Sequence, residues 1–71
     1  MKEITATVVF NHFEGGFWGL IDKDKNKYVP VNMPEQLKVE GKTSVIVISE
    51  RPDVTGIQMW GAYVEIISFN T

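Results

Sequence analysis

His12 is the single histidine of the chain and its first candidate for chemistry, because imidazole is the commonest general base and a frequent metal ligand. The nearest side chain that could orient it is Glu14, two residues further on. The sequence contains no cysteine, so a zinc site of the usual type cannot be assembled. We interpret His12 as an exposed residue beside a hairpin, and we predict no metal site and no cofactor.

The segment from Asp22 to Asn26 has the D-x-D-x-N spacing that opens an EF-hand calcium loop. The rest of that loop is missing, because Lys27 stands at the glycine position and Met33 at the position of the bidentate glutamate. The lysines interleaved with these carboxylates could contact phosphate, but the acidic neighbours neutralise most of the local charge. We interpret the segment as a polar hairpin loop.

Arg51 and Asp53 flank Pro52 at a predicted turn. A buried pair between the two charges that pins the turn is favoured over ligand recognition. The sequence contains no P-loop and no cysteine nucleophile, and no Ser-His-Asp set can be drawn from it. Because catalysis requires several polar groups that converge, we expect no enzyme and no catalytic residue.

The elements that position these residues are mostly strands. Alternating apolar residues predict a strand over 3–13, the glycines at 15 and 16 predict a tight turn, and further apolar runs predict strands over 17–22, 28–31, 44–49 and 62–69. The one helical signal runs from Asn32 to Lys38, where Asn32 or Met33 can cap and Pro34 suits the first turn. It predicts one or two helical turns near residues 33–38.

A chain of 71 residues is expected to form a single domain, spanning 1–71, and is too short for a seven-stranded sandwich. Closing a small sheet on itself is the other way to remove exposed strand edges. We therefore predict an all-β fold, a small five-stranded OB-like barrel with the short helix between strands three and four. An SH3-like barrel is the alternative, and it would place the helix later or reduce it to a single 3₁₀ turn.

The composition is that of a globular protein, with 44% hydrophobic and 23% charged residues. The net charge of -2 disfavours nucleic acid and acidic lipid as partners. No apolar run approaches the roughly 18 residues of a membrane span. The first residues also lack the uninterrupted apolar stretch of a secretory signal. We expect a soluble, cytoplasmic protein, although a mature exported or lipid-anchored domain without its leader would have the same features.

The first 31 residues resemble the N-terminal half of a cold-shock domain in layout, through Val9 to Asn11, Gly16 to Ile21 and Tyr28 to Val31. That family stacks single-stranded bases on outward side chains of strands one to three. The resemblance implies stacking at five positions, of which two keep a ring, and Pro30 stands at the family's histidine position. Those five positions are Val9, Trp18, Leu20, Tyr28 and Val31.

A second resemblance covers most of the chain and is to a group of small microbial OB-like domains. The motifs that carry it are the stretch from Glu14 to Ile21, Val31 to Glu35, Arg51 to Asp53, and Ile57 to Gly61. This resemblance implies the barrel fold. It brings no activity, substrate or catalytic residue.

The aromatic residues are too numerous for so narrow a barrel, so some are expected at the surface. Phe17 and Ile21 form the better inward set on their strand, together with Val29 and Val31 across the hairpin, which leaves the opposite parity outside. We predict that the partner-binding residues lie on that outer face: Trp18, Leu20, Tyr28 and Trp60. Tyr63 and Met59 could join this patch, and packing in the core or at the barrel mouth is the alternative for these side chains.

Exposed tryptophan and tyrosine carry much of the binding energy at interfaces. The sequence therefore predicts a non-catalytic binding module that recognises an unidentified protein or small ligand through an aromatic barrel face. A weak binder of single-stranded nucleic acid, of the cold-shock or OB type, is the second hypothesis.

Overall fold

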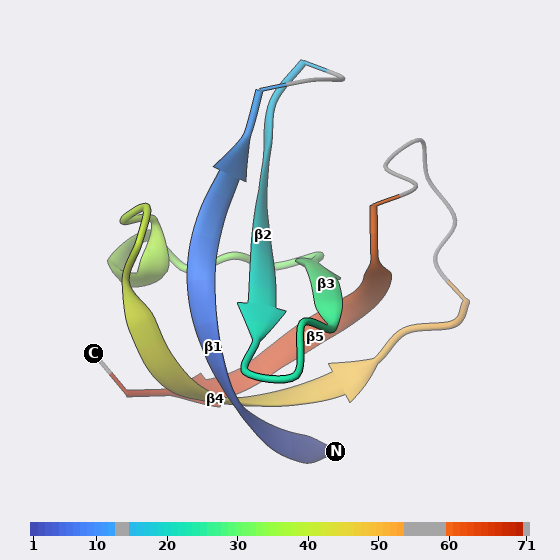
Figure 1. Cartoon of the computed structure of the whole chain (residues 1–71). Coiled ribbons are helices and arrows are strands. Elements are labelled where there is room, and N and C mark those ends of the chain that lie inside the picture. The colour runs from blue at the N-terminus through green and yellow to red at the C-terminus, as the bar shows by residue number, and fades with distance from the viewer. Residues whose placement is uncertain (13–14, 54–59, 71) are drawn as a thin grey trace.

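The computed structural model describes residues 1–12, 15–53 and 60–70 and shows an all-β fold whose strands close into a barrel (Figure 1). The order around the barrel is β1-β2-β3-β5-β4, with β4 paired back to β1. The pair of β3 and β5 is parallel and the other pairs are antiparallel. The strands are β1 Lys2–Asn11, β2 Phe17–Asp22, β3 Lys27–Pro30, β4 Thr43–Glu50 and β5 Ala62–Phe69. The predicted fold class is confirmed, and each strand end lies within two residues of its predicted place.

The helical segment is shorter than predicted. It is one 3₁₀ turn, η1 Glu35–Leu37, between β3 and β4. Asn32 does not cap it, because its side chain accepts a hydrogen bond from Ile66 N (2.8 Å) and donates one to Ile66 O (3.0 Å), which prolongs the contact between β3 and β5. A single 3₁₀ turn is expected of an SH3-like barrel. However, the position of this turn before β4 and the order of the strands fit the OB-like barrel.

Alternate residues of all five strands fill the barrel interior. On β1 the inward parity is the predicted one, with Ile4, Ala6 and Val8 buried. η1 contributes Leu37, which is completely buried and packs into the same cluster. The remaining members of the cluster are Leu20, Tyr28, Ile46, Ile48, Val64 and Ile66.

β2 faces the opposite way from the prediction. Leu20 lies opposite Val8 in the antiparallel β1–β2 pair, and residues directly opposite each other share one face of a sheet. Leu20 therefore follows Val8 into the core and is 0% exposed, and Tyr28, which pairs with Leu20, is 4% exposed. The predicted exposure of Leu20 and Tyr28 is wrong, and Phe17 and Ile21 have the outward parity instead.

The facing of β3 follows from its pairing with β2. With Tyr28 in the core, the neighbouring Val29 has the outward parity, and it is buried outside the core cluster. Val31, which follows the strand, is 42% exposed. The predicted inward position of Val31 is therefore wrong, whereas Val29 is buried as predicted but with the outward parity.

The carboxylate of Asp22 makes the observed facing of β2 possible. Asp22 shares the parity of Leu20 and is buried, which a charged group tolerates only when it is well hydrogen-bonded. Its Oδ1 accepts the backbone N–H groups of Asp24 and Asn26, both at 2.9 Å. Its Oδ2 accepts the Tyr28 hydroxyl at 3.0 Å and the Asn26 amide at 3.2 Å. Asp22 thus organises the polar hairpin loop and anchors a core tyrosine at once.

Burial of Asp22 by itself raises the pKa of its carboxyl, but the hydrogen bonds from Asn26, Tyr28 and Asp24 outweigh burial and hold that pKa below the ordinary 3.8. A lowered folded-state pKa stabilises the protein above the unfolded value, and that stabilisation is lost as the pH falls through the folded value. The free energy of unfolding of Asp22→Asn should therefore fall less steeply with decreasing pH than that of the natural protein. Urea unfolding at steps from about pH 6 to about pH 2 measures this, and a difference between the two proteins that stays constant below about pH 4 would contradict it.

Candidate aromatic binding groove

A groove of ≈ 450 Å³ opens where β2, β3 and β5 lie side by side. Three of the side chains that line it are aromatic: Phe17 and Trp18 from β2 and Tyr63 from β5. Val29 lies beside Tyr63 in the parallel pair and forms part of the lining. We call this feature the aromatic groove, and its lining is completed by residues 30–33 and Lys38.

The Trp60 ring extends the aromatic surface along the outer side of β2. It lies directly on the backbone at Gly19, where a Cβ atom would overlap the ring, so only glycine leaves room for it. Its edge-to-face contact with Phe17 has a centroid distance of 5.9 Å and an interplanar angle of 74°. The Lys27 ammonium lies 5.3 Å from the centroid of the Trp60 ring, within cation–π range. A continuous surface thus runs from the aromatic groove over Phe17 to Trp60 and Lys27.

Trp18 occupies the rim of the barrel. It has the inward parity of Leu20 but lies near the start of β2, so it is half-buried and packs against the edge of the core. Its ring meets Phe10 edge-to-face, with centroids 4.9 Å apart. In Figure 1 the β1–β2 hairpin extends beyond the other strands at this end, and Phe10 and Trp18 are paired within it.

His12 continues this aromatic stack, with its ring 4.9 Å from that of Phe10. It is exposed, as predicted. Its suggested partner Glu14 lies outside the described residues, as does Met59.

The structure brings two of the four predicted site residues to one surface. Trp18 lines the aromatic groove and Trp60 adjoins it through Phe17, whereas Leu20 and Tyr28 belong to the core. Phe17, which the sequence pattern places in the core, instead lines the groove. Gly19 was the available signal, because a glycine of Phe17's parity in mid-strand commonly marks a close approach by another group.

Two polar side chains of the aromatic groove, Asn32 and Lys38, are already bonded within the protein. Both polar atoms of the Asn32 amide are bound to the backbone of Ile66. The Lys38 ammonium is paired with Glu35 at 3.0 Å. The groove therefore offers aromatic surface and little unsatisfied charge.

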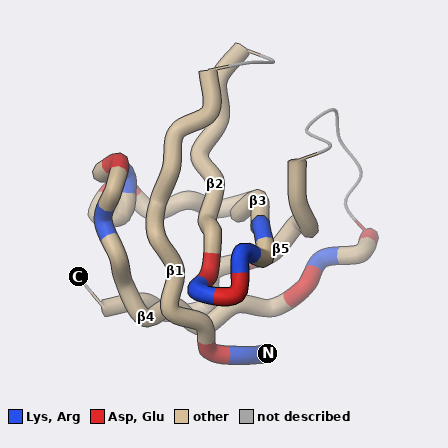
Figure 2. Tube along the Cα trace, viewed as in Figure 1, with Lys and Arg blue, Asp and Glu red and all other residues tan. Residues whose placement is uncertain are grey.

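The charges of the protein lie mostly elsewhere. Figure 2 shows them in the 22–27 loop, near the N-terminus, beyond the end of β4 and around η1. Across residues 4–12 and 15–21, which include most of the β1–β2 hairpin, there is no lysine, arginine, aspartate or glutamate. The side chains of these two stretches therefore offer a ligand apolar and uncharged polar contacts.

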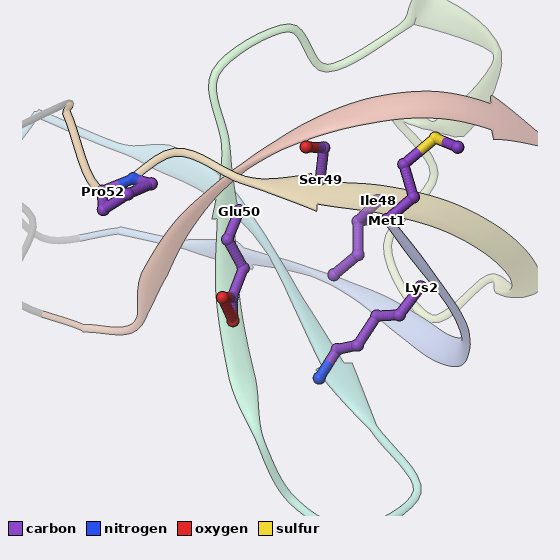
Figure 3. A pocket seen from close by; sticks show the side chains of 6 residues that line it. All are labelled: Met1, Lys2, Ile48, Ser49, Glu50 and Pro52. Carbon is purple, nitrogen blue, oxygen red and sulfur yellow. The ribbon is translucent and has the colours of Figure 1, made fainter.

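A second hollow, of ≈ 420 Å³, lies between the start of β1 and the end of β4 (Figure 3). Its lining includes Lys2 and Glu50, whose charged ends project to the same side in the view, and Pro52. Among the described residues, no aromatic ring lines it, and the side chains of Lys2 and Glu50 carry opposite charges. It offers fewer of the groups that dominate binding energy than the aromatic groove does.

Arg51 and Asp53 form the predicted pair, with hydrogen bonds of 3.1 Å from Nε and 3.0 Å from Nη2. The pair is solvent-accessible, so the expected burial is wrong. The Arg51 backbone N–H donates to Tyr63 O at 2.9 Å, which ties the turn to β5. The role of this pair is therefore structural, because Arg51 holds the turn after β4 against β5.

Among residues 1–12, 15–53 and 60–70, no group of three or more His, Cys, Asp and Glu side chains could hold a metal ion. The same part of the chain contains no helix that is long and apolar enough to cross a membrane. Comparisons with family models, curated proteins and solved structures give no significant match. The two family resemblances therefore rest on their motifs alone.

Proposed function

We propose that this protein is a non-catalytic binding module that holds an apolar part of its ligand in the aromatic groove, beside the adjoining Trp60 ring. The observation that carries the proposal is the gathering of half-buried rings from β2, from β5 and from Trp60, two residues before β5. Aromatic side chains bury much area with few rotatable bonds, so they dominate binding energy at such surfaces. OB folds bind their ligands on the face of strands two and three, and the aromatic groove is lined by residues of β2 and β3 together with Tyr63 of β5.

A binding role without catalysis fits the chemistry of the lining. Catalysis requires a nucleophile or base within reach of a partner that activates it. In the aromatic groove, the Asn32 amide is hydrogen-bonded to the backbone of Ile66, and the Lys38 ammonium is paired with the Glu35 carboxylate. These commitments leave the rings as the main source of ligand contact.

Single-stranded nucleic acid is the weaker hypothesis. Two of the five positions implied by the cold-shock resemblance, Leu20 and Tyr28, are buried and unavailable for stacking. Trp18 is then the only ring left among the five. The net charge of -2 also opposes the phosphate contacts that supply most nucleic-acid affinity.

The proposal is tested by titrating isotope-labelled protein with small uncharged ring compounds, namely indole, cyclohexanol and N-acetylprolinamide, and following amide NMR shifts. Shifts are expected at Phe17, Trp18 and Tyr63. Phe17→Ala should weaken binding about tenfold, the effect of losing a central aromatic contact. Ile67→Ala, which truncates a residue of β5 that is 47% exposed and does not line the groove, is the matched control and should leave affinity unchanged.

Other outcomes would redirect or contradict the proposal. Shifts confined to Lys2 and Glu50 would move the binding site to the second hollow. A single-stranded deoxythymidine oligomer that bound at micromolar concentration in about 50 mM salt, with shifts at Trp18, would favour the nucleic-acid hypothesis, because phosphate contacts are strongest at low salt.

A further inference from the structure

The chemistry of the aromatic groove restricts its ligand class. An oligosaccharide presents many hydroxyl groups, and each one that is buried needs a hydrogen-bond partner. The amide of Asn32 and the ammonium of Lys38 are already committed to Ile66 and Glu35. The groove therefore suits a ligand that buries apolar rings and needs few hydrogen bonds.

The shape of the surface suits an extended chain. It runs beside β3 from Lys27 to Val31, and four steps along a strand span about 13 Å. A polyproline II helix rises about 3.1 Å per residue, so about four residues would cover that length. The edge-to-face arrangement of Phe17 and Trp60 leaves the rings inclined at 74°, which produces ridges and slots instead of one flat plate. Proline-rich segments bind aromatic grooves of this kind because their conformation is already fixed before binding.

One end of this surface is positively charged. The Lys27 side chain is exposed and its ammonium lies over Trp60. Within the described part of the chain, no carboxylate forms an ion pair with it. A ligand with an acidic residue next to its apolar segment would complement this charge.

We infer that the ligand of the aromatic groove is a proline-rich peptide segment in the polyproline II conformation, flanked by an acidic residue that meets Lys27. The inference rests on the proposed function and names the ligand class of the same site. The rings of Phe17, Trp18 and Tyr63 take the proline rings, and Trp60 with Lys27 receives the acidic flank.

Three synthetic peptides test the inference: a proline hexamer with glutamate at both ends, the same hexamer with lysine at both ends, and a Gly-Ser hexamer with glutamate at both ends. The chain has two tryptophans, Trp18 and Trp60, and both lie at the site, so their fluorescence reports binding along with amide NMR shifts. The glutamate-flanked proline peptide should bind about two- to fivefold more tightly than the lysine-flanked one, as expected for an exposed ion pair. The Gly-Ser peptide should bind at least about tenfold more weakly, because its flexible backbone must be ordered.

Lys27→Gln should remove the preference between glutamate and lysine flanks and leave proline recognition in place. Equal affinity of the natural protein for the two proline peptides would overturn the acidic flank. If the proline peptides cause no shift at Phe17, Trp18 or Tyr63 while indole or cyclohexanol still does, the peptide class is wrong and the binding-module proposal stands. If neither peptides nor ring compounds shift these residues, both proposals fail.

Discussion

Leu20→Ala is expected to lower the free energy of unfolding by about 2–5 kcal/mol, the range for removing a buried leucine side chain and leaving a cavity. Leu20 is fully buried at the centre of the barrel, opposite Val8 on β1 and Tyr28 on β3. A domain of 71 residues has a total stability of roughly 4–11 kcal/mol, so the loss is a large fraction of the whole. Urea unfolding followed by circular dichroism measures it.

Ile21→Ala is the matched control, because it truncates a side chain of equal size on the next residue of the same strand. Ile21 has the outward parity and is only half-buried, so we expect a cost of about 1 kcal/mol, near the centre of the range for point substitutions. If Ile21→Ala proved more costly than Leu20→Ala, the facing of β2 in this structure would be wrong. The aromatic groove would then lose Phe17, and the binding proposal would fail with it.

Gly61→Ala is expected to cost about 3 kcal/mol, the upper part of the range for overpacking. A Cβ atom at position 61 would lie 2.5 Å from Lys27 O and 2.6 Å from the Lys27 carbonyl carbon. These are backbone atoms at the start of β3, and Gly61 immediately precedes β5, whose Ala62 pairs with Tyr28. The overlap can be relieved only by moving β3 and β5 apart. Thermal or urea unfolding gives the cost.

Gly19→Ala provides the comparison, because its new Cβ atom would meet the far end of the Trp60 ring instead of a backbone. A side chain can swing away, so we expect a smaller cost than for Gly61→Ala, together with a change in Trp60 fluorescence as the ring leaves β2. If Gly61→Ala were tolerated as well as Gly19→Ala, the close approach of Gly61 to β3 would not exist in solution.

Gly19→Ala also separates the two parts of the proposed site. It displaces Trp60 without altering the side chains that line the aromatic groove. The contribution of the Trp60 ring to peptide affinity can therefore be measured independently of Phe17 and Tyr63.

The sequence by itself determined where the strands lie. Apolar alternation, the glycine pair and the polar loop after Asp22 are local signals, and the observed strand bounds follow them closely. The barrel followed from chain length and the need to remove strand edges. The position of the 3₁₀ turn before β4 was also predictable. Its length was not, because the Asn32 side chain forms hydrogen bonds with the backbone of Ile66 in β5 and does not cap the turn.

Only the tertiary structure decided which side of β2 faces the core. Both parities of residues 17–22 contain large apolar side chains, and the set that is in fact buried includes the charged Asp22. The register with β1 places Leu20 opposite Val8, and the Tyr28 hydroxyl and the loop amides satisfy the Asp22 carboxylate. Neither the pairing nor these hydrogen bonds can be read from a single strand.

The candidate site depends on that same decision. A shift of one residue in facing exchanges every side chain between the core and the surface. It moved Leu20 and Tyr28 inside and left Phe17 outside, where it lines the groove with Tyr63 and meets Trp60 in an edge-to-face contact. The sequence determined that a small barrel would carry surplus aromatic rings, and long-range strand pairing decided which rings form its outer surface, because facing is set by the partner strand and not by the strand itself.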